Sequence, residues 1–414
     1  MADVAAVFIL AATLLAVMRP PRPWPEVAWT APAAGLVVLV GLETPHQAWD
    51  GVRPLLPTVI FLAAIFVVAD VAERAGLFDL AGQRLEQAGR SQWRLLASVA
   101  LLAVGITTVL SLDATAVLFT PVVIRAVRDR PNRDAPLLAT ILLANGASTL
   151  LPVANLTNLL AFRQLHLSFV GFAERMALPT AVAAVTITLT CSVFGSRSAE
   201  PSEVQAFHRA KPTAPDRTAR LVMLGIVALL VAFFVGSSLG AEPAWMAVAG
   251  AVILGGVAIR RLDTRPSHLL AAISPAFLGF VICLAVVVDT ARRHGLANVV
   301  DHLPSGHGLA ALLGLAAVAA VLANVVNNLP ATLILLPALS GRAKGLMLAM
   351  LLGVNIGPNL TYTGSLATLL WRKVVRAERV EPSVGSFYRI SAVATPLALV
   401  GAVVALWLTL HLVR

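Results

Sequence analysis

The chain has 414 residues, of which 58% are hydrophobic and only 13% are charged, whereas soluble domains carry about 25% charged residues. Because apolar windows long enough for spanning helices recur throughout it, this composition excludes a soluble enzyme and indicates a polytopic protein of the cell membrane. The net charge of +10 does not indicate nucleic acid binding, since the basic residues lie in short segments between apolar windows, as in cytoplasmic loops beside anionic lipid.

The first half of the chain predicts six features in order. Helices are expected near 3 to 18, 27 to 42 and 55 to 72, followed by a helical hairpin at about 93 to 126 whose arms meet at Asp113, a broken helix at about 135 to 165, and a span near 177 to 195. If the hairpin is re-entrant, five true spans remain. An odd number of spans would place the second half in the opposite orientation.

The second half repeats the order of these features. The segment from 142 to 160 matches that from 351 to 370, with Asn145 on Asn355, 210 positions apart, and the segment from 68 to 77 matches that from 287 to 296. The sequence therefore predicts an all-α fold of two inverted-topology repeats, each of about five spans, one re-entrant hairpin and a broken helix. The first repeat is residues 1 to 195 and the second is 219 to 414, with its hairpin at about 307 to 341 and its broken helix at about 344 to 374. A polar cytoplasmic linker, 196 to 218, separates them.

The distribution of basic residues predicts the orientation. In this topology 23 of the 31 Lys and Arg fall in the loops that face away from the termini. Because cytoplasmic loops carry the excess of Lys and Arg, we expect both termini to be extracytoplasmic.

Polar residues inside the broken helices are the candidate binding residues. Non-helical backbone is tolerated at membrane depth only where it is buried in protein or lines a cavity, and there it can hold solute and coupling ion. The alternative is that these side chains only satisfy backbone groups or hold helices together. The candidates are Asn145, Ser148, Thr149, Asn155, Thr157 and Asn158 in one half, and Asn355, Asn359, Thr361, Thr363, Ser365 and Thr368 in the other.

The hairpin tips supply the remaining candidates, which are Ser111, Asp113, Thr115, Asn327 and Asn328. Ser111 and Asp113 are natural helix N-caps, but an ionisable residue within a membrane segment also predicts a functional role. A carboxylate at the tip suits a proton, a cation or a neutral polyol-like solute and disfavours an anion.

The other acidic residues and the cysteines predict no chemistry. Asp70 and Asp289 end their spans four residues before arginines, which is typical of surface ion pairs. A pair among Asp70, Asp113 and Asp289 could in principle serve an intramembrane aspartyl protease. None of the three has the Gly-x-Gly-Asp setting of such an enzyme, so no enzyme is expected. The two cysteines, Cys191 and Cys283, are far apart in sequence and predict neither a metal centre nor a disulfide framework.

Four segments closely resemble the arsenite efflux permeases of the ArsB type: SLDATAVLFTP, NGASTLLPVANLTNLL, NNLPATLILLP and above all IGPNLTYTGSLATLLW. The resemblance extends in order over nearly the whole chain. The short apolar motifs are shared with the wider ion transporter superfamily, including NhaD-type sodium/proton antiporters and, distantly, the divalent anion:sodium symporters. The permeases carry Asp at the positions of Asn145 and Asn355, and an Asn-Asp pair where this chain has Leu112-Asp113.

The resemblance implies a secondary active transporter that works by alternating access. The expected activity is proton-coupled efflux of arsenite or antimonite as the neutral trihydroxide, with no cofactor and no resident metal. A sodium/proton antiporter or another permease of the same superfamily, with sodium as coupling ion, is the alternative. A cytosolic ATPase partner is possible, because some relatives work with one and this chain itself has no phosphate-binding loop of the GxxxxGK type. A homodimer is a second possible assembly.

Overall fold

The computed structural model describes residues 2–18, 24–88, 91–130, 132–196, 215–296 and 303–412, and all regular structure in these ranges is helical. Eight of the helical segments are long and apolar enough to cross a membrane. They are Pro45–Arg74, Gln92–Val109, Phe169–Phe194, Arg217–Ser238, Pro243–Arg261, Pro266–His294, Leu309–Val326 and Val384–Leu412.

The first half follows the predicted order. Its elements are α1 (Ala2–Met18), α2 (Val27–Leu39), α3 (Pro45–Val52), η1 (Arg53–Leu55), α4 (Leu56–Arg74), α5 (Leu77–Gln87), α6 (Gln92–Val109), α7 (Leu112–Ala114), the π-turn η2 (Thr115–Phe119), α8 (Thr120–Val127), α9 (Asp134–Ala147), η3 (Pro152–Ala154), α10 (Leu156–Leu165) and α11 (Phe169–Ser196). The elements from α6 to α8 cover the segment predicted as the first hairpin, and α9, η3 and α10 cover the segment predicted as the broken helix.

The second half repeats this order. Its elements are α12 (Arg217–Ser238), α13 (Pro243–Arg261), α14 (Pro266–Ala272), α15 (Pro275–Ala291), the π-turn η4 (Arg292–Leu296), α17 (Leu309–Val326), α18 (Asn328–Ala338), α19 (Lys344–Ile356), η5 (Gly357–Leu360), α20 (Leu366–Ala377) and α21 (Val384–Leu412). Most of the predicted linker, residues 197 to 214, lies outside the described residues.

Helix α5 departs from the expectation, because residues 73 to 94 carry no apolar window and read as a loop. The segment is instead an amphipathic helix that buries Phe78, Ala81 and Leu85 and leaves its polar side outward. It packs against α8, the second arm of the first hairpin.

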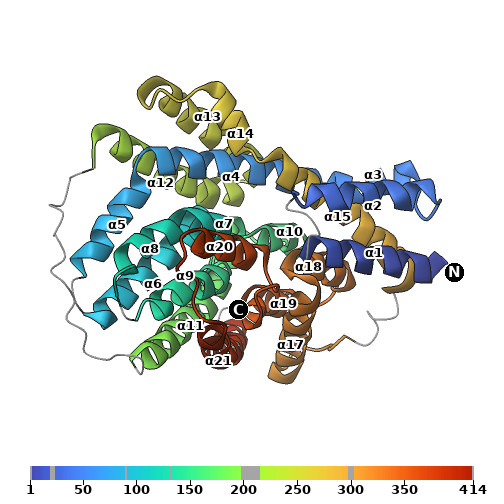
Figure 1. Ribbon diagram of the computed structural model, residues 1–414. Coiled ribbons are helices and arrows are strands. Elements are labelled where there is room, and N and C mark those ends of the chain that lie inside the picture. Colours follow the sequence, from blue (N-terminus) through green and yellow to red (C-terminus); the bar gives the residue numbers. More distant parts are fainter. Residues whose placement is uncertain are drawn as a thin grey trace.

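The two halves interlock through helices that hold matching places in the repeat. Helix α4 packs against α13, α2 packs against α15, and the long helices α11 and α21 pack against each other. Figure 1 shows α10 and α20 near the middle of the molecule, between α4 on one side and α11 and α21 on the other. The first arms of the two broken helices, α9 and α19, are buried along nearly their whole length, whereas α20 buries one face. That the halves have inverted topology, and that the hairpins are re-entrant, stay predictions.

Glycine allows the closest approach within the second half. A Cβ atom at Gly353 of α19 would lie 2.4 Å from the backbone oxygen of Ala316 of α17, and one at Gly357 would lie 2.3 Å from the Cβ of Ala320. Small residues at membrane helix interfaces allow such backbone contact. Here they bring the broken helix directly onto the first arm of the second hairpin.

Candidate functional site

Local sequence starts and stops the helices at each break. Pro152 and Pro358 interrupt the two broken helices because proline cannot donate a backbone hydrogen bond. Asn155 then caps α10 by accepting a hydrogen bond from the Thr157 amide at 3.3 Å, and Ser365 caps α20 by accepting one from the Thr368 amide at 3.1 Å. The capping roles expected of such residues are therefore present.

The first hairpin tip holds Ser111, Asp113 and Thr115. The Ser111 hydroxyl accepts a hydrogen bond from the Ala114 amide at 3.1 Å and so caps α7. The Thr115 hydroxyl lies 2.7 Å from that of Thr107 on the facing arm, and both threonines are fully buried. This bond fastens the two arms beside Asp113. Thr107 was not predicted from sequence, although a threonine within an apolar helix is the signal that could have drawn attention to it.

The Asp113 side chain lines a cavity of about 400 Å³ between the first hairpin, α4 and the first turn of α15. No described residue forms a hydrogen bond or an ion pair with its carboxylate. The same cavity is lined by Glu26, Asp70 and Glu73, and none of its described lining residues is Lys, Arg or His. The cavity is therefore acidic from its rim to the hairpin tip.

Both predicted ion pairs at the ends of α4 and α15 are present. Arg74 contacts Asp70 at 2.7 Å, and Arg293 contacts Asp289 at the same distance. The pairing confirms the structural reading of these two aspartates. Asp70 nevertheless belongs to the Asp113 cavity, which the sequence did not indicate.

Asn355 is the centre of a buried amide network between the halves. Its side-chain oxygen accepts hydrogen bonds from Asn155 at 2.7 Å and from Thr157 at 2.8 Å. Its side-chain nitrogen donates to Asn158 at 2.8 Å. One side chain of α19 thus holds three residues from the broken helix of the other half.

Asn145, which aligns with Asn355, likewise contacts the broken helix of the other half, but through a different set of partners. Its side-chain nitrogen lies 2.9 Å from the Asn359 oxygen and 3.2 Å from the Thr368 hydroxyl, whereas its side-chain oxygen has no hydrogen-bond partner. Ser148 joins the two sets because it donates to the Asn145 backbone oxygen and accepts from Asn155. Residues from both predicted polar clusters therefore join in one continuous network, to which Thr149, Thr361 and Thr363 do not belong.

The second hairpin tip is closed by backbone contacts. Asn327 has φ of +78°, a conformation that is uncommon for residues other than glycine, and its side chain donates to the Thr363 oxygen at 3.3 Å. The Asn328 amide donates to the Gly364 oxygen at 3.0 Å. The tip is thus fastened to the non-helical part of the broken helix.

Asn324, which was not predicted, braces the same region. Its amide group donates to the Gly357 oxygen at 2.8 Å, and its side-chain oxygen accepts from Thr361 at 2.8 Å. Asparagine inside the apolar run of α17 was the available signal.

The structure divides the seventeen candidates into three groups and leaves one apart. The amide network contains Asn145, Ser148, Asn155, Thr157, Asn158, Asn355, Asn359, Ser365 and Thr368. The first hairpin tip contains Ser111, Asp113 and Thr115, and the second contains Asn327, Asn328, Thr361 and Thr363. Thr149 lies apart and shares a hydrogen bond with Thr180 of α11 at 2.8 Å.

The cysteines are both free, with Cys191 buried and Cys283 half-buried. Within the described ranges, no group of three His, Cys, Asp or Glu side chains is arranged to hold a metal ion.

The chain is similar to transport proteins over most of its length. It is 27% identical over 411 residues to the arsenical pump membrane protein of Yersinia enterocolitica, covering 94% of each chain, and 27% identical over 415 residues to that of Escherichia coli, again covering 94% of each. The crystal structure of the YdaH transporter from Alcanivorax borkumensis superimposes with a TM-score of 0.53 at 16% identity, over 99% of this chain and 98% of that one. The citrate transporter family model, CitMHS, matches residues 6–356, and the chain is a member of this family of membrane transporters.

Proposed function

We propose that this protein is a proton-coupled efflux permease for arsenite and antimonite, with Asp113 as the coupling residue. The observation that carries the proposal is the Asp113 carboxylate, which has no partner among the described residues and lies in an acidic cavity. The similarity over 94% of the chain to arsenical pump membrane proteins supports this choice of solute.

The lining of the cavity bears on the class of solute. Asp70 is paired with Arg74, but Glu26, Glu73 and Asp113 form no ion pair among the described residues, so the lining would still repel citrate, which is a trianion near neutral pH. Arsenite is mostly the uncharged trihydroxide at that pH and offers hydroxyl groups. A carboxylate, the Ser111 hydroxyl and nearby backbone groups suit hydroxyl groups, so a neutral trihydroxide fits this cavity better than a carboxylate anion does.

The small number and wide separation of the cysteines suit a protein that releases As(III) and does not hold it. Three thiolates together would bind As(III) tightly and release it slowly. Cys191 is buried on α11 and Cys283 lies on α15, so two separate thiols cannot form a three-thiol site. A transporter has to release its solute on the far side, and hydroxyl and amide ligands permit this.

One proton per solute is energetically sufficient. A proton that enters across 100 mV makes about 2.3 kcal/mol available, and at about 1.4 kcal/mol per factor of ten this supports roughly a 40-fold gradient of a neutral solute. In the proposed cycle Asp113 is protonated from outside when the site is empty and loses its proton inward as solute binds. The first hairpin and the broken helices would move against the surrounding helices.

The proposed orientation places both termini outside and the central linker in the cytoplasm. The loops assigned to the cytoplasm contain 23 of the 31 Lys and Arg, which supports this choice. The Asp113 cavity, which begins at Glu26 and at Glu73 near the end of α4, would then open to the cytoplasm. An inward-facing cavity is what loading of an efflux substrate requires. A cytosolic ATPase and a second copy of the chain remain proposed partners.

The acidic cavity also favours a second candidate, a sodium/proton antiporter, because carboxylates attract sodium as well as protons. Everted vesicles that contain the protein distinguish the two. Energised uptake of arsenite, independent of sodium, supports efflux of arsenite. Proton movement on addition of sodium, without arsenite uptake, would instead establish the antiporter and refute the proposed solute.

A further inference from the structure

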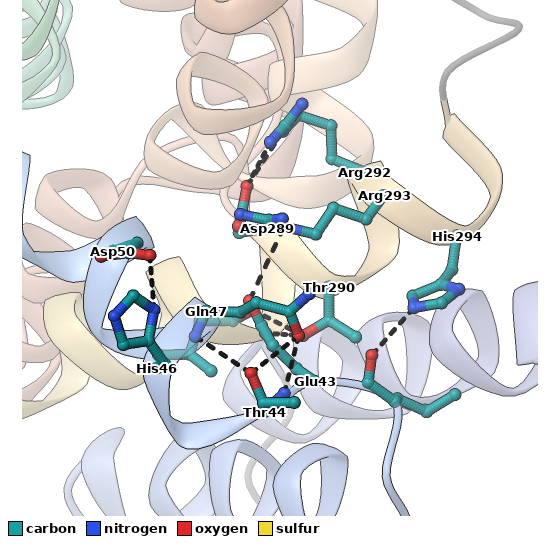
Figure 2. A network of polar contacts seen from close by, with 12 residues as sticks. Glu43, Thr44, His46, Gln47, Asp50, Asp289, Thr290, Arg292, Arg293 and His294 are labelled. Atoms are coloured by element: carbon teal, nitrogen blue, oxygen red, sulfur yellow. Dashed lines mark hydrogen bonds and ion pairs between the residues drawn. The ribbon is translucent and has the colours of Figure 1, made fainter.

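Glu43 is a fully buried carboxylate in the connection between α2 and α3, far in sequence from every candidate site residue. Its side chain is 0% exposed. Thr290 of α15 donates a hydrogen bond to one carboxylate oxygen, whereas no hydrogen-bond donor reaches the other oxygen in the described structure. Arg293 is the nearest cation, but its Nε atom lies 3.8 Å from that second oxygen, which is too far for a hydrogen bond. Figure 2 shows Glu43 directed at this end of α15.

Arg293 forms its short ion pair with Asp289 and not with Glu43. Asp289 binds Arg293 at 2.7 Å and Arg292 at 2.6 Å (Figure 2). Burial raises the pKa of Glu43, the Thr290 hydrogen bond opposes this, and the negative charge of Asp289 raises the pKa further, so that the net pKa lies above its ordinary value. The packed arrangement therefore favours the neutral form of Glu43.

Other titratable groups also surround the connection. His294 of η4 contacts the Leu42 backbone oxygen at 2.8 Å and lies 3.7 Å from Asp3 of α1. On α3, His46 contacts Asp50 at 2.9 Å. A Cβ atom at Gly51 would lie 3.2 Å from the Asp289 carboxylate, so α3 packs directly on the charged cluster. Any pH dependence here has to be separated from that of the two histidines.

The same cluster borders a second cavity. Asp289, Arg292 and Arg293 line a cavity of about 300 Å³ that continues between α10 and α18. Asp289 and Arg292 lie 219 positions after Asp70 and Glu73, which line the Asp113 cavity, so the two cavities occupy matching places in the two halves. They differ in depth.

The Asp113 cavity reaches the tip of its hairpin, whereas the second cavity is lined by Leu333, Leu336 and Pro337, farther along α18 than the tip residues Asn327 and Asn328. One side of the molecule is therefore open to its hairpin tip, and the other is closed. The contacts of Glu43 with Thr290 and of Leu42 with His294 hold the α2–α3 connection against the end of α15 on the closed side.

A π-turn, η4, follows α15 directly at this place. Such turns are rare and occur frequently at functional sites. In the first half the position that matches Thr290 is Val71, whose side chain has no hydrogen-bond donor. The polar tie is therefore specific to the closed side.

We propose that Glu43, with Thr290, Asp289 and Arg293, is a proton-operated latch that keeps the second cavity from reaching its hairpin tip, closed when Glu43 is protonated and released when Glu43 ionises. A protonated Glu43 can donate to Asp289, whereas an ionised one is repelled by Asp289 and favours hydration. The contribution to closure is complete below the pKa that Glu43 has when exposed, and it is lost as the pH rises through the higher pKa of the closed form. The inference concerns accessibility and does not depend on which solute is carried.

The test measures how accessible the second hairpin tip is to a thiol reagent. Cys191 and Cys283 are replaced by alanine, and a single reporter, Leu329→Cys, which lies beside the second hairpin tip, is buried here and does not line the second cavity, is labelled with N-ethylmaleimide in detergent solution between pH 5 and pH 8. A second protein with the reporter Val117→Cys in the Asp113 cavity is labelled in parallel. The ratio of the two rates removes the pH dependence that thiol ionisation gives to both reactions.

We expect this ratio to rise with pH, by up to about tenfold for each unit by which the pKa of Glu43 differs between the closed and open forms. Glu43→Gln should hold the ratio low at every pH, since the amide can donate as the protonated acid does. Thr290→Val should raise the ratio at every pH. His46→Gln and His294→Gln should each leave the rise in place.

Three results would overturn the proposal. These are a ratio that does not change with pH, an unchanged rise in Glu43→Gln, and a rise that disappears in either histidine variant. If Glu43→Gln does not fold, the native chain, Thr290→Val and the histidine variants still decide the question.

Discussion

The central amide network predicts that Asn355 and Asn145 contribute unequally to stability, although they hold matching positions in the repeat. Asn355→Ala would remove three hydrogen bonds, of 2.7, 2.8 and 2.8 Å, and leave Asn155, Thr157 and Asn158 without these partners. Asn145→Ala would remove two, of 2.9 and 3.2 Å, and would also remove an oxygen that is already unpaired.

The expected difference follows from the strength of such bonds. Hydrogen bonds between membrane helices contribute about 0.6 kcal/mol each on average and up to about 1.7 kcal/mol. Asn355→Ala should therefore cost about 2 to 5 kcal/mol and Asn145→Ala about 1 to 3 kcal/mol. Thermal unfolding of the purified protein in detergent measures both. A loss for Asn145→Ala equal to or larger than that for Asn355→Ala would refute this account of the network.

A third variant tests the chemistry of the position, since the arsenite permeases carry aspartate there. In Asn355→Asp the two hydrogen bonds from Asn155 and Thr157 can be kept, but the second oxygen then faces the Asn158 oxygen and needs a proton to donate to it. We expect Asn355→Asp to be more stable than Asn355→Ala at pH 6 and to lose this advantage at pH 9. Equal stability of the two variants at pH 6 would contradict the geometry.

Three further predictions concern other parts of the fold. Burial alone would raise the pKa of Glu381, but hydrogen bonds from Arg376 and Arg372 outweigh this effect and lower the pKa. The unfolding temperature should therefore fall as the pH drops through that lowered pKa, and Glu381→Gln should remove this part of the acid dependence. Gly353→Ala should lower the unfolding temperature because its Cβ would lie 2.4 Å from the Ala316 oxygen, whereas Gly256→Ala, with nothing within 4 Å, should not. Thr107→Val should lower transport and leave expression intact, because it frees the arms beside Asp113, and uptake per unit of protein measures this.

The sequence predicted local features well because local chemistry determines them. Pro152 opens the short turn η3 at the break, where its fixed backbone and missing N–H disfavour a continuous helix, and Asn155 and Ser365 stand where a new helix needs a cap. The hairpin, the broken helices and the candidate residues could therefore be located from repeats and turn residues. Helix α5 was missed because an amphipathic helix with few apolar residues does not produce the window by which a membrane helix is found.

The pairing of these residues could not be predicted. Asn145 and Asn359 lie 214 positions apart, and their contact depends on how the two halves pack. Alignment of the repeats shows which residues are equivalent, but it does not show that each asparagine binds the opposite half. Glu43 was missed for a related reason, since a glutamate at the end of an apolar segment resembles an exposed loop residue until α15 covers it.

The measurement that tests the proposed function most directly is respiration-driven arsenite uptake into everted vesicles, with and without a protonophore. Asp113→Asn is compared with the native chain and with Asp79→Asn, a matched change at an exposed residue of α5 that pairs with Arg125. We predict that the native chain and Asp79→Asn accumulate arsenite until the protonophore is added and that Asp113→Asn does not accumulate it. Proton-dependent accumulation by Asp113→Asn would contradict the coupling role of Asp113, and no accumulation by the native chain, verified in the membrane, would contradict arsenite efflux itself.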